Sequence, residues 1–349
     1  MKLHEIKIAI GKNGSMWHDK LAQAFDKRID QGQIVNYSII DIDHNDWIKT
    51  VEQFDVVIWK PAYLGAVSAS YLKEKIYFIE KHMGKLVIPN FDSIWHFESK
   101  IAQSYIFKYH AIPSPKTIVT FDYKNAKELI DQMELPAVLK ESFGSSSENV
   151  YIVKNRRKLN GIVANIFCQQ LWDESRAKLN SIYKTFFRNI TNLWAWKKIW
   201  QVISGSERFA VSYWQEFVSG NSADLRITVI GDRFAYAFWR KNRPNDFRAS
   251  GSGLIDYKHD IPEAPLRYCL QMNKRFSFDS MAYDILFTES GNFVVVEMSY
   301  GYIDAALYKA NGYFELLEKG NLCFHEGHTW PQELWIEWSL IRVNNFYCG

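Results

Sequence analysis

Residues 281–298 read MAYDILFTESGNFVVVEM, two apolar runs that flank a polar turn. Such a pattern is typical of a β-hairpin. A two-residue turn centred on Ser290 and Gly291 pairs Asp284 directly with Glu297, so both carboxylates share one face. Their Cβ atoms then lie about 5 Å apart, close enough for both to hold Mg²⁺. The stretch predicts a metal site; in the alternative, one or both acids face solvent or pair with an arginine.

The composition is that of a globular protein with an unusual aromatic content. Of the 349 residues, 47% are hydrophobic and 23% charged, and the length suggests two or three packed modules. Aromatic residues make up 16%, including 13 Trp, which favours stacking surfaces or interfaces. The formal net charge of +3 is too small for a nucleic-acid-binding body, so we expect no nucleic-acid partner.

The sequence contains no recognisable targeting signal. Its first residues lack a long apolar segment with a small-residue cleavage site, and no run of about 18 apolar residues occurs. The 4 cysteines are scattered without CxxC spacing, as reduced thiols in an intracellular protein usually are. We therefore expect a cytoplasmic protein.

The apolar pattern divides the chain into three parts. Residues 1–98 alternate short apolar runs with helical periodicity, which predicts an N-terminal α/β domain. Residues 99–215 start with an amphipathic helix at Lys100–His110 and continue with short strands and a helix, which predicts a small lid domain. In residues 216–349 strands return and end in the acidic hairpin, which predicts a C-terminal antiparallel-sheet domain.

A basic and aromatic segment at residues 156–205 interrupts the lid. It holds 9 Lys or Arg residues against only Asp173 and Glu174, interleaved with Phe and Trp. Such a segment would lie on an anionic membrane surface or grip a polyanionic acceptor. The alternative is a helical insertion that packs its aromatic side chains on the core.

Lys140 ends an apolar strand and precedes a loop of small residues, Gly144, Ser145, Ser146 and Ser147. A strand-end lysine can hold the α and β phosphates of a nucleotide while backbone N–H groups of such a loop contact the γ phosphate. The spacing is not the GxxxxGK[ST] of a P-loop. The alternative is a solvated lysine without a ligand.

A second nucleotide contact is predicted where another apolar strand ends. Glu216, Phe217 and Val218 follow that strand, and the alternation of polar and apolar residues that is typical of a strand resumes at Asp224. Backbone groups of Glu216 to Val218 would offer donors and acceptors to an adenine edge, and an acidic side chain would contact the ribose hydroxyls. The alternative is an ordinary strand connection.

Taken in order, these segments resemble the ATP-grasp superfamily, specifically its amino-acid and peptide ligase-like members. The resemblance covers roughly residues 90–305. It is carried by Ser99-Lys100, Ile112-Pro113-Ser114-Pro115-Lys116-Thr117, Leu139-Lys140 with its Gly/Ser loop, Gln215-Glu216-Phe217-Val218, Asp224-Leu225-Arg226, Arg240, Asp246-Phe247-Arg248, Asp284 and Glu297-Met298-Ser299.

The resemblance implies an ATP-grasp fold of mixed α/β and α+β character, with ATP and Mg²⁺ as cofactors. It implies ATP-phosphate contacts from Lys100, Lys140 and the loop at Gly144, Ser145 and Ser146. It implies adenine contacts from Glu216, Phe217 and Val218, with Asp224 near the ribose or in an adjacent polar network. It also implies arginines for the substrate carboxyl and acyl phosphate (Arg226, Arg240 and Arg248) and magnesium ligands (Asp284, Glu297 and Ser299).

One position departs from the pattern of the superfamily. Ser299 stands where members usually carry Asn two residues after the metal-bridging Glu. A hydroxyl reaches less far than an amide carbonyl, so a second metal would be held more weakly or through water. The change also leaves open a degenerate, non-catalytic relative.

The implied reaction is ATP-dependent ligation of a carboxylate to an amine through an acyl phosphate, with release of ADP and phosphate. The alternatives are a kinase that phosphorylates a hydroxyl and a non-catalytic nucleotide-binding protein. The Glu-x-Ser-Tyr-Gly segment at 297–301 resembles ligase-like proteins of bacterial surface-polysaccharide pathways, which implies a glycan-linked substrate. The resemblance is also compatible with a homodimer.

Two other motifs are weaker. Cys323 to His328 places a thiol and two imidazoles within six residues, but no fourth ligand motif follows, and we expect a polar surface loop. Gly11 to Gly14 follows a strand without GxGxxG, which predicts a structural turn.

Overall fold

The computed structural model describes residues 6–12, 16–31, 36–61, 66–140, 150–167, 211–244 and 246–347. Contacts among these residues separate two compact units. The first unit holds the described residues up to 114 and from 218 onward, and the second holds those between 115 and 217. The chain therefore passes between the units after Ser114 and after Phe217. The predicted three-domain division stays a prediction.

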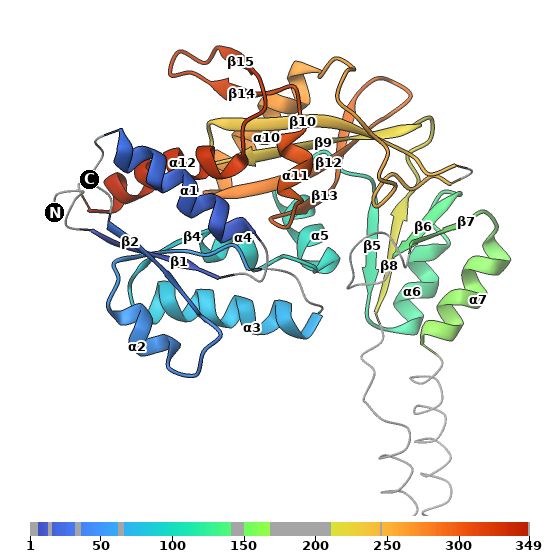
Figure 1. Ribbon diagram of the computed structural model, residues 1–349. Coiled ribbons are helices and arrows are strands. Elements are labelled where there is room, and N and C mark those ends of the chain that lie inside the picture. Colours follow the sequence, from blue (N-terminus) through green and yellow to red (C-terminus); the bar gives the residue numbers. More distant parts are fainter. Residues whose placement is uncertain are drawn as a thin grey trace, which may run out of the picture. The chain divides into compact units, whose positions relative to one another are not determined.

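The first unit begins with a four-stranded parallel sheet in the order β2-β1-β3-β4 (Figure 1). The strands are β1 (Lys7–Gly11), β2 (Asn36–Ile40), β3 (Val56–Ile58) and β4 (Leu86–Ile88). Helix α1 (Trp17–Asp30) buries Leu21 and Phe25 on one face, and α3 (Ala66–Tyr77) buries Leu72 and Ile76 on the other. Because both faces are covered, β3 and β4 are apolar and buried throughout, whereas the edge strand β2 has exposed polar residues at Asn36 and Ser38.

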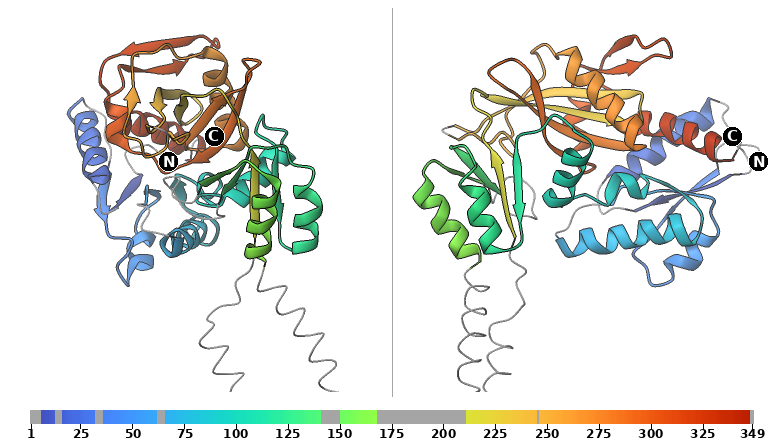
Figure 2. Two further views of the ribbon diagram at one scale, coloured as in Figure 1. Left: turned by 90° about the vertical axis from the view of Figure 1, so that its right-hand side faces the viewer. Right: turned by 180° about the vertical axis from the view of Figure 1, so that it is seen from behind.

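A larger antiparallel sheet forms the rest of the core of this unit, in the order β13-β12-β9-β10-β14-β15, with β11 paired to β10. The strands are β9 (Ala223–Ile230), β10 (Phe234–Lys241), β11 (Ile255–Asp256), β12 (Ser280–Phe287), β13 (Phe293–Ser299), β14 (Gly312–Leu316) and β15 (Leu322–Glu326). Odd-numbered residues of β9 and β12, such as Leu225 and Tyr283, join one apolar cluster with α10 (Glu263–Phe276). Figure 2 shows α10 lying along these strands.

The remaining helices of this unit connect or cover the two sheets. They are α2 (Trp47–Glu52), the π-helical turn Phe78–His82, α4 (Phe91–Ile94), α5 (Lys100–Tyr109), α11 (Asp304–Tyr308) and α12 (Pro331–Tyr347). Helix α12 buries Leu334 and Trp335 in the cluster that also contains α1 and the opposite face of β10. The C-terminal helix therefore stabilises both sheets.

The described residues of the second unit form a four-stranded antiparallel sheet in the order β5-β8-β6-β7 with two helices. Its elements are β5 (Thr117–Thr120), α6 (Tyr123–Ile130), β6 (Ala137–Lys140), β7 (Val150–Val153), α7 (Arg156–Ile166) and β8 (Ser212–Glu216). Ile130 of α6 and Leu159 of α7 pack on Trp214 of β8. Helix α7 opens the predicted insertion, and residues 168–210 lie outside the described residues.

Two expectations from the sequence are wrong. The hairpin has no two-residue turn: residues 288–292 form a wider loop, closed by the Thr288 N–H, which donates to the Asn292 carbonyl at 2.8 Å. A bulge between Asp284 and Ile285 then shifts the register by one residue. The expected surface loop at Cys323–His328 is mostly strand β15, because its residues pair with β14.

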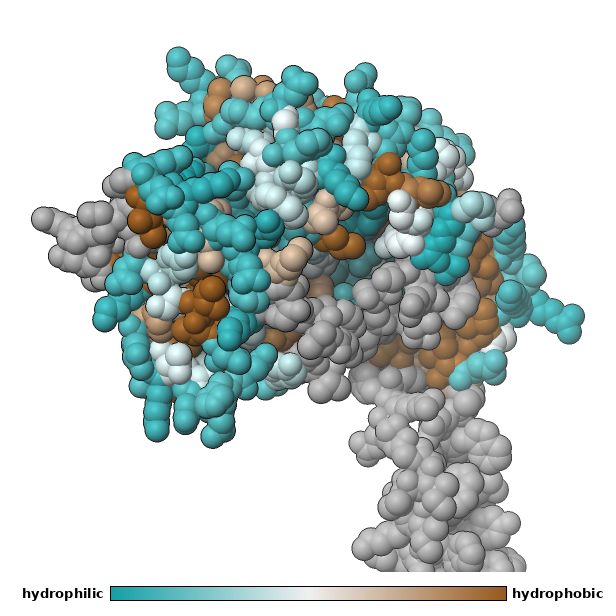
Figure 3. Space-filling view, viewed as in Figure 1, coloured by the Kyte–Doolittle hydropathy of each residue, from teal (hydrophilic) through white to brown (hydrophobic). Residues whose placement is uncertain are grey.

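No helix of the described residues is both long enough and apolar enough to cross a membrane. On the first unit, hydrophilic residues cover most of the face in Figure 3 and hydrophobic ones form small separate patches. Scattered apolar residues of this kind are normal on a protein surface.

Candidate nucleotide and metal site

One face of the antiparallel sheet carries a row of charged residues. Asp284 on β12 pairs in register with Arg226 on β9 and with Glu297 on β13. Arg240 on β10 pairs with Asp224 on β9. Paired residues, and residues two apart on one strand, point to the same face. The five side chains therefore share one face of four neighbouring strands, as the sequence predicts for Asp284 and Glu297.

Four of these residues form an ion-pair network. Arg240 donates two hydrogen bonds to Asp224, at 2.7 and 2.6 Å, and its Nη2 lies 2.7 Å from Oδ2 of Asp284. Arg226 donates to Oδ2 of Asp284 at 3.1 Å, and its Nε lies 2.5 Å from Oδ1 without hydrogen-bond alignment. Asp224 and Asp284 are only 8% and 7% exposed, so they need these cations. The alternative raised for the two acids, pairing with an arginine, is therefore present for Asp284.

Burial and neighbouring charge act on these carboxyl pKa values in opposite directions. Burial raises the pKa of Asp284, but Arg226 and Arg240 outweigh it and hold the pKa below its usual value. For Asp224 burial dominates over Arg240, so its pKa is raised. Burial lowers the pKa of Arg240, but the two carboxylates outweigh it and raise that pKa. Asp284 therefore stays ionised at neutral pH.

Glu297 lies opposite Asp284 but in a different environment. It is half-buried, and within the described part of the chain its carboxylate makes no hydrogen bond or ion pair. Mg²⁺ is usually held by one or two carboxylates together with water and substrate phosphates, so the two acids fit this ion in number and chemistry. Among the described residues no group of three or more His, Cys, Asp or Glu could hold a metal. Their magnesium role stays a prediction.

Ser299 and Arg248 each have a partner in the structure. The Ser299 hydroxyl donates to the Gly301 carbonyl at 3.2 Å and accepts from the Gly301 N–H at 3.1 Å, so it closes a turn after β13. Arg248 lies on the loop after β10 and donates to Oδ2 of Asp246 from Nε at 2.8 Å and from Nη2 at 2.6 Å, and its Nε also donates to Oδ1 at 3.0 Å. Hydrogen bonds from Arg248 hold the pKa of Asp246 below its usual value. The predicted roles of Ser299 in metal binding and of Arg248 in substrate binding stay predictions.

Lys140 is held at the end of β6 in the second unit. Its ammonium donates to Oε1 of Gln215 at 2.6 Å, and Nε2 of Gln215 donates to the Thr117 hydroxyl at 3.2 Å. Gln215 is 2% exposed, so this amide fixes the lysine from inside the sheet. Sequence reasoning missed Gln215 as a partner. The available signal was a glutamine at an inward position of an apolar strand.

Lys100 is the first residue of α5, in the first unit. The Ser99 hydroxyl caps this helix by accepting the Ala102 N–H at 3.2 Å. N–H groups at the start of a helix favour anions, which is consistent with the predicted phosphate contact.

Glu216 ends β8 with an exposed side chain. Its N–H donates to the Lys116 carbonyl at 2.9 Å, so an adenine contact from its backbone has to use its carbonyl. The Val218 carbonyl accepts a long bond of 3.4 Å from the Asn221 amide. The adenine contacts predicted for Glu216, Phe217 and Val218 stay predictions. Gly144, Ser145 and Ser146 lie outside the described residues.

Comparison with known proteins identifies the fold. A family described as the RimK-like ATP-grasp domain matches residues 98–182. The α-aminoadipate–LysW ligase LysX of Saccharolobus solfataricus is 24% identical over 278 residues, which cover 78% of this chain and 86% of that protein.

Two solved structures have a similar fold at low sequence identity. The ADP complex of an N5-carboxyaminoimidazole ribonucleotide synthetase matches with a TM-score of 0.54 at 12% identity, covering 88% of this chain and 73% of that one. A D-alanine–D-alanine ligase of Bacillus anthracis with bound ATP matches with a TM-score of 0.50 at 12% identity, covering 84% and 86%.

These similarities show that the chain has an ATP-grasp fold. The fold predicted from the order of the sequence segments is thereby confirmed. The predicted site residues lie in both units. In the first unit, the acids and Arg226 and Arg240 lie on one sheet face, Lys100 at the start of α5 and Arg248 on a loop. In the second unit, Lys140 and Glu216 lie at the ends of strands.

Proposed function

We propose that the protein is an ATP-dependent carboxylate–amine ligase. A substrate carboxylate attacks the γ phosphate of ATP, ADP leaves, and an amine displaces phosphate from the acyl phosphate to form an amide. Every bond change occurs between the substrates, so the protein supplies charge and orientation without a nucleophile of its own.

The pairing of Asp284 with Glu297 next to Arg226 and Arg240 carries the proposal. It supplies two adjacent carboxylates for Mg²⁺ and two guanidinium groups for anionic oxygens on one sheet face. A ligase that neutralises a triphosphate and holds a carboxylate needs both kinds of group. A sheet that needed only stability would be served as well by apolar residues in these positions.

The nucleotide contacts follow the predicted assignments. Lys140, fixed by Gln215, and Lys100 at the start of α5 bind phosphate oxygens. The backbone at Glu216 to Val218 contacts the adenine, and the Gly144–Ser146 loop contacts the terminal phosphate. Mg²⁺, when held by Asp284 and Glu297 with help from Ser299, neutralises phosphate charge.

The ion-pair network suggests how the arginines reach the substrate. Without ligand, Arg226 and Arg240 neutralise Asp224 and Asp284. Mg²⁺ held by Asp284 would compete with the guanidinium groups for that carboxylate. Arg226 and Arg240 would then be available to the substrate carboxylate and the acyl phosphate, with Arg248 contributing from the loop. Asp224 keeps Arg240 oriented through its two hydrogen bonds.

The first test is calorimetric titration of Mg-ATP into wild-type protein and the variants Lys140→Ala and Glu297→Gln. We expect saturable binding that both changes weaken. Lys127→Ala is a matched control, because Lys127 is exposed on α6 of the same unit as Lys140. Absence of binding to the wild type contradicts the proposal, and so does equal weakening by the control.

The second test distinguishes ligation from its alternatives. With a substrate carboxylate and hydroxylamine as the amine, a ligase forms a hydroxamate and releases ADP and phosphate in equal amounts. A kinase releases ADP without phosphate. ATP binding without turnover across a screen of carboxylates, amines and alcohols supports a non-catalytic nucleotide-binding protein.

We also propose a carbohydrate-linked substrate as a finer assignment. Its support is the aromatic content of 16%, which suits stacking on sugars, and the resemblance of the Glu-x-Ser-Tyr-Gly segment at 297–301 to ligase-like proteins of surface-polysaccharide pathways. Contact of the 156–205 segment with an anionic membrane, a cytoplasmic location and a homodimer remain proposals of the same kind. Ligation of free amino acids with no turnover of glycan carboxylates would contradict the glycan assignment.

A further inference from the structure

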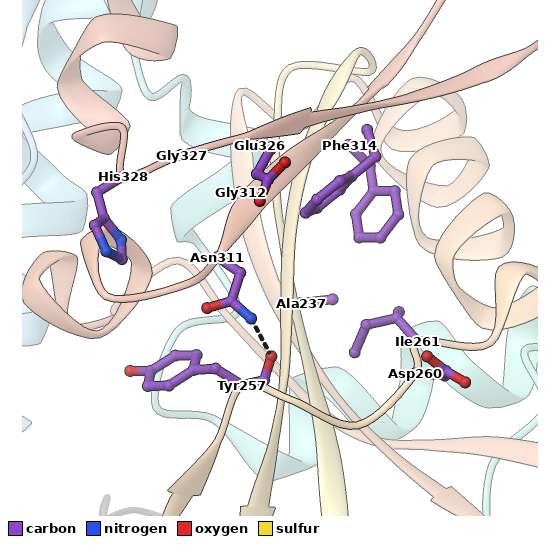
Figure 4. Close-up of a pocket in the computed structure, with 11 residues that line it drawn as sticks. Ala237, Tyr257, Asp260, Ile261, Asn311, Gly312, Phe314, Glu326, Gly327 and His328 are labelled. Atoms are coloured by element: carbon purple, nitrogen blue, oxygen red, sulfur yellow. Dashed lines mark hydrogen bonds between the residues drawn. The ribbon is translucent and has the colours of Figure 1, made fainter.

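A pocket of about 470 Å³ opens on the first unit, lined by β10, the β14–β15 hairpin and the segment 257–261 (Figure 4). Its apolar wall is formed by Ala237, Ile261, Phe314 and Phe324. The Phe314 and Phe324 rings lie 5.0 Å apart at 52°. The volume is within the range of small-molecule sites, which are typically lined by aromatic and apolar side chains with a few polar groups.

The pocket is separate from the candidate ligase site. Ala237, Ile261 and Phe314 pack against the apolar cluster that contains α10. They therefore lie on the same face of the sheet as Leu225 of β9 and Tyr283 of β12. Arg240, three residues beyond Ala237 on β10, lies on the opposite face, because side chains alternate along a strand. A ligand in the pocket therefore cannot contact the charged row from the same side.

Gly312 is what allows the hairpin to form this wall. A Cβ at this position would lie 2.1 Å from the His325 carbonyl oxygen and 2.6 Å from the Phe324 ring. With glycine, β15 approaches β14 closely enough for Phe324 to reach Phe314. The wall is therefore built by close packing of two strands.

The pocket lining contains two carboxylates and one imidazole, His328, whose Nδ1 hydrogen-bonds the Ala310 carbonyl at 3.0 Å. Asp260 and Glu326 line it, and among the described residues neither carboxylate has a hydrogen bond or an ion pair. No Lys or Arg is among its described lining residues. Two backbone contacts hold the rim: the Trp239 indole donates to the Asp260 carbonyl at 3.1 Å, and the Asn311 amide donates to the Tyr257 carbonyl at 2.9 Å.

We propose that this pocket binds a small organic cation, a protonated amine on an apolar or aromatic stem. The ammonium pairs with Asp260 and Glu326, and the stem packs on Phe314 and Phe324. Phenyl ring faces attract cations, and unpaired carboxylates favour a cation over an anion of the same shape. The site does not depend on the ligase reaction, so it holds whether or not the protein ligates.

The test uses phenethylamine as the probe and phenylacetate as its counterpart of opposite charge. Saturable binding of each is measured by ligand-detected NMR at constant ionic strength, with wild-type protein and with Asp260→Asn, Glu326→Gln and the double variant. We expect phenethylamine to bind, each single change to weaken it about two- to fivefold, and the double change to weaken it about tenfold. Phenylacetate should not saturate.

Glu318→Gln is the matched control, because it removes the same charge from the turn of the same hairpin outside the pocket lining. It should leave phenethylamine binding unchanged. Each of the four variants replaces exposed carboxylates with amides of similar size, and circular dichroism verifies that each variant folds. The proposal is overturned if phenethylamine shows no saturable binding, if the double variant binds it as the wild type does, or if phenylacetate binds equally well.

Discussion

The two faces of the central antiparallel sheet use the same strands in opposite ways. On the odd-numbered face of β9 and β12, Leu225 and Tyr283 are buried against α10. On the even-numbered face the same strands present Asp224, Arg226 and Asp284. One residue step therefore separates a surface that stabilises the fold by apolar burial from one that keeps charges in fixed positions. Substitutions on the two faces should separate stability from ligand binding.

The largest effect is expected from Asp284→Asn on the charged face. The change leaves Arg226 and Arg240 buried with one carboxylate between them. Breaking such a network costs about 3–5 kcal/mol of unfolding free energy, and Mg-ATP binding should also weaken. Urea unfolding and calorimetry measure both effects. If this variant lost neither stability nor nucleotide affinity, the charged face would have no special role.

Leu270→Ala tests the apolar face. Leu270 is buried in α10 against the odd-numbered positions, and its truncation should cost about 2–5 kcal/mol. Because the cavity forms on the side away from the charged row, the affinity for Mg-ATP should not change under conditions where the variant is folded. A loss of affinity similar to that of Asp284→Asn would mean that the two faces do not act separately.

His96 sharpens the comparison, because its ring lies 5.4 Å from Phe278 of the apolar cluster. Burial and the charge of Lys73 lower the pKa of His96 to about 3. The unfolded chain takes up a proton below about pH 6.5 and the folded protein does not, so stability falls as pH falls from 6.5 towards 3. Between pH 7.5 and 5.5 this amounts to about 1.4 kcal/mol. Urea unfolding should show that loss in the wild type and not in His96→Phe.

The smallest stability effect is expected from Glu297→Gln. This carboxylate is half-buried and makes no ion pair in the described part of the chain, so the substitution should change the unfolding free energy by less than about 0.5 kcal/mol. Magnesium-dependent turnover should nevertheless be lost. A stability loss as large as that of Asp284→Asn would assign Glu297 a structural role instead.

The sequence predicted local patterns well and distant partners poorly. Alternation correctly placed Asp284 opposite Glu297, although the expected turn was wrong. The wider loop and the bulge at Ile285 shift the register in opposite directions and so restore the predicted pair. The pairing of Arg226 with Asp284 depends on how β9 and β12 align across 58 residues of sequence, which no local pattern encodes.

Other predictions failed because tertiary contacts determined the outcome. Cys323 to Glu326 has few strong strand formers, and it becomes β15 because β14 offers an edge to pair with. Helix α3 was not predicted, although its apolar side fills one face of the parallel sheet. By contrast, the apolar strand predicted to end at Lys140 is present as β6 (Ala137–Lys140), because an apolar run ended by a charge is a local signal.

The bulge at Ile285 also has a practical consequence for protein engineering. It lies between the loop at 288–292 and the acid pair, so it can take up small changes in the length of that loop before they reach Asp284. The loop is thus suited to carry an inserted epitope or fluorescent label for following ligand binding. We therefore expect this loop to tolerate an insertion only a few residues from the candidate site.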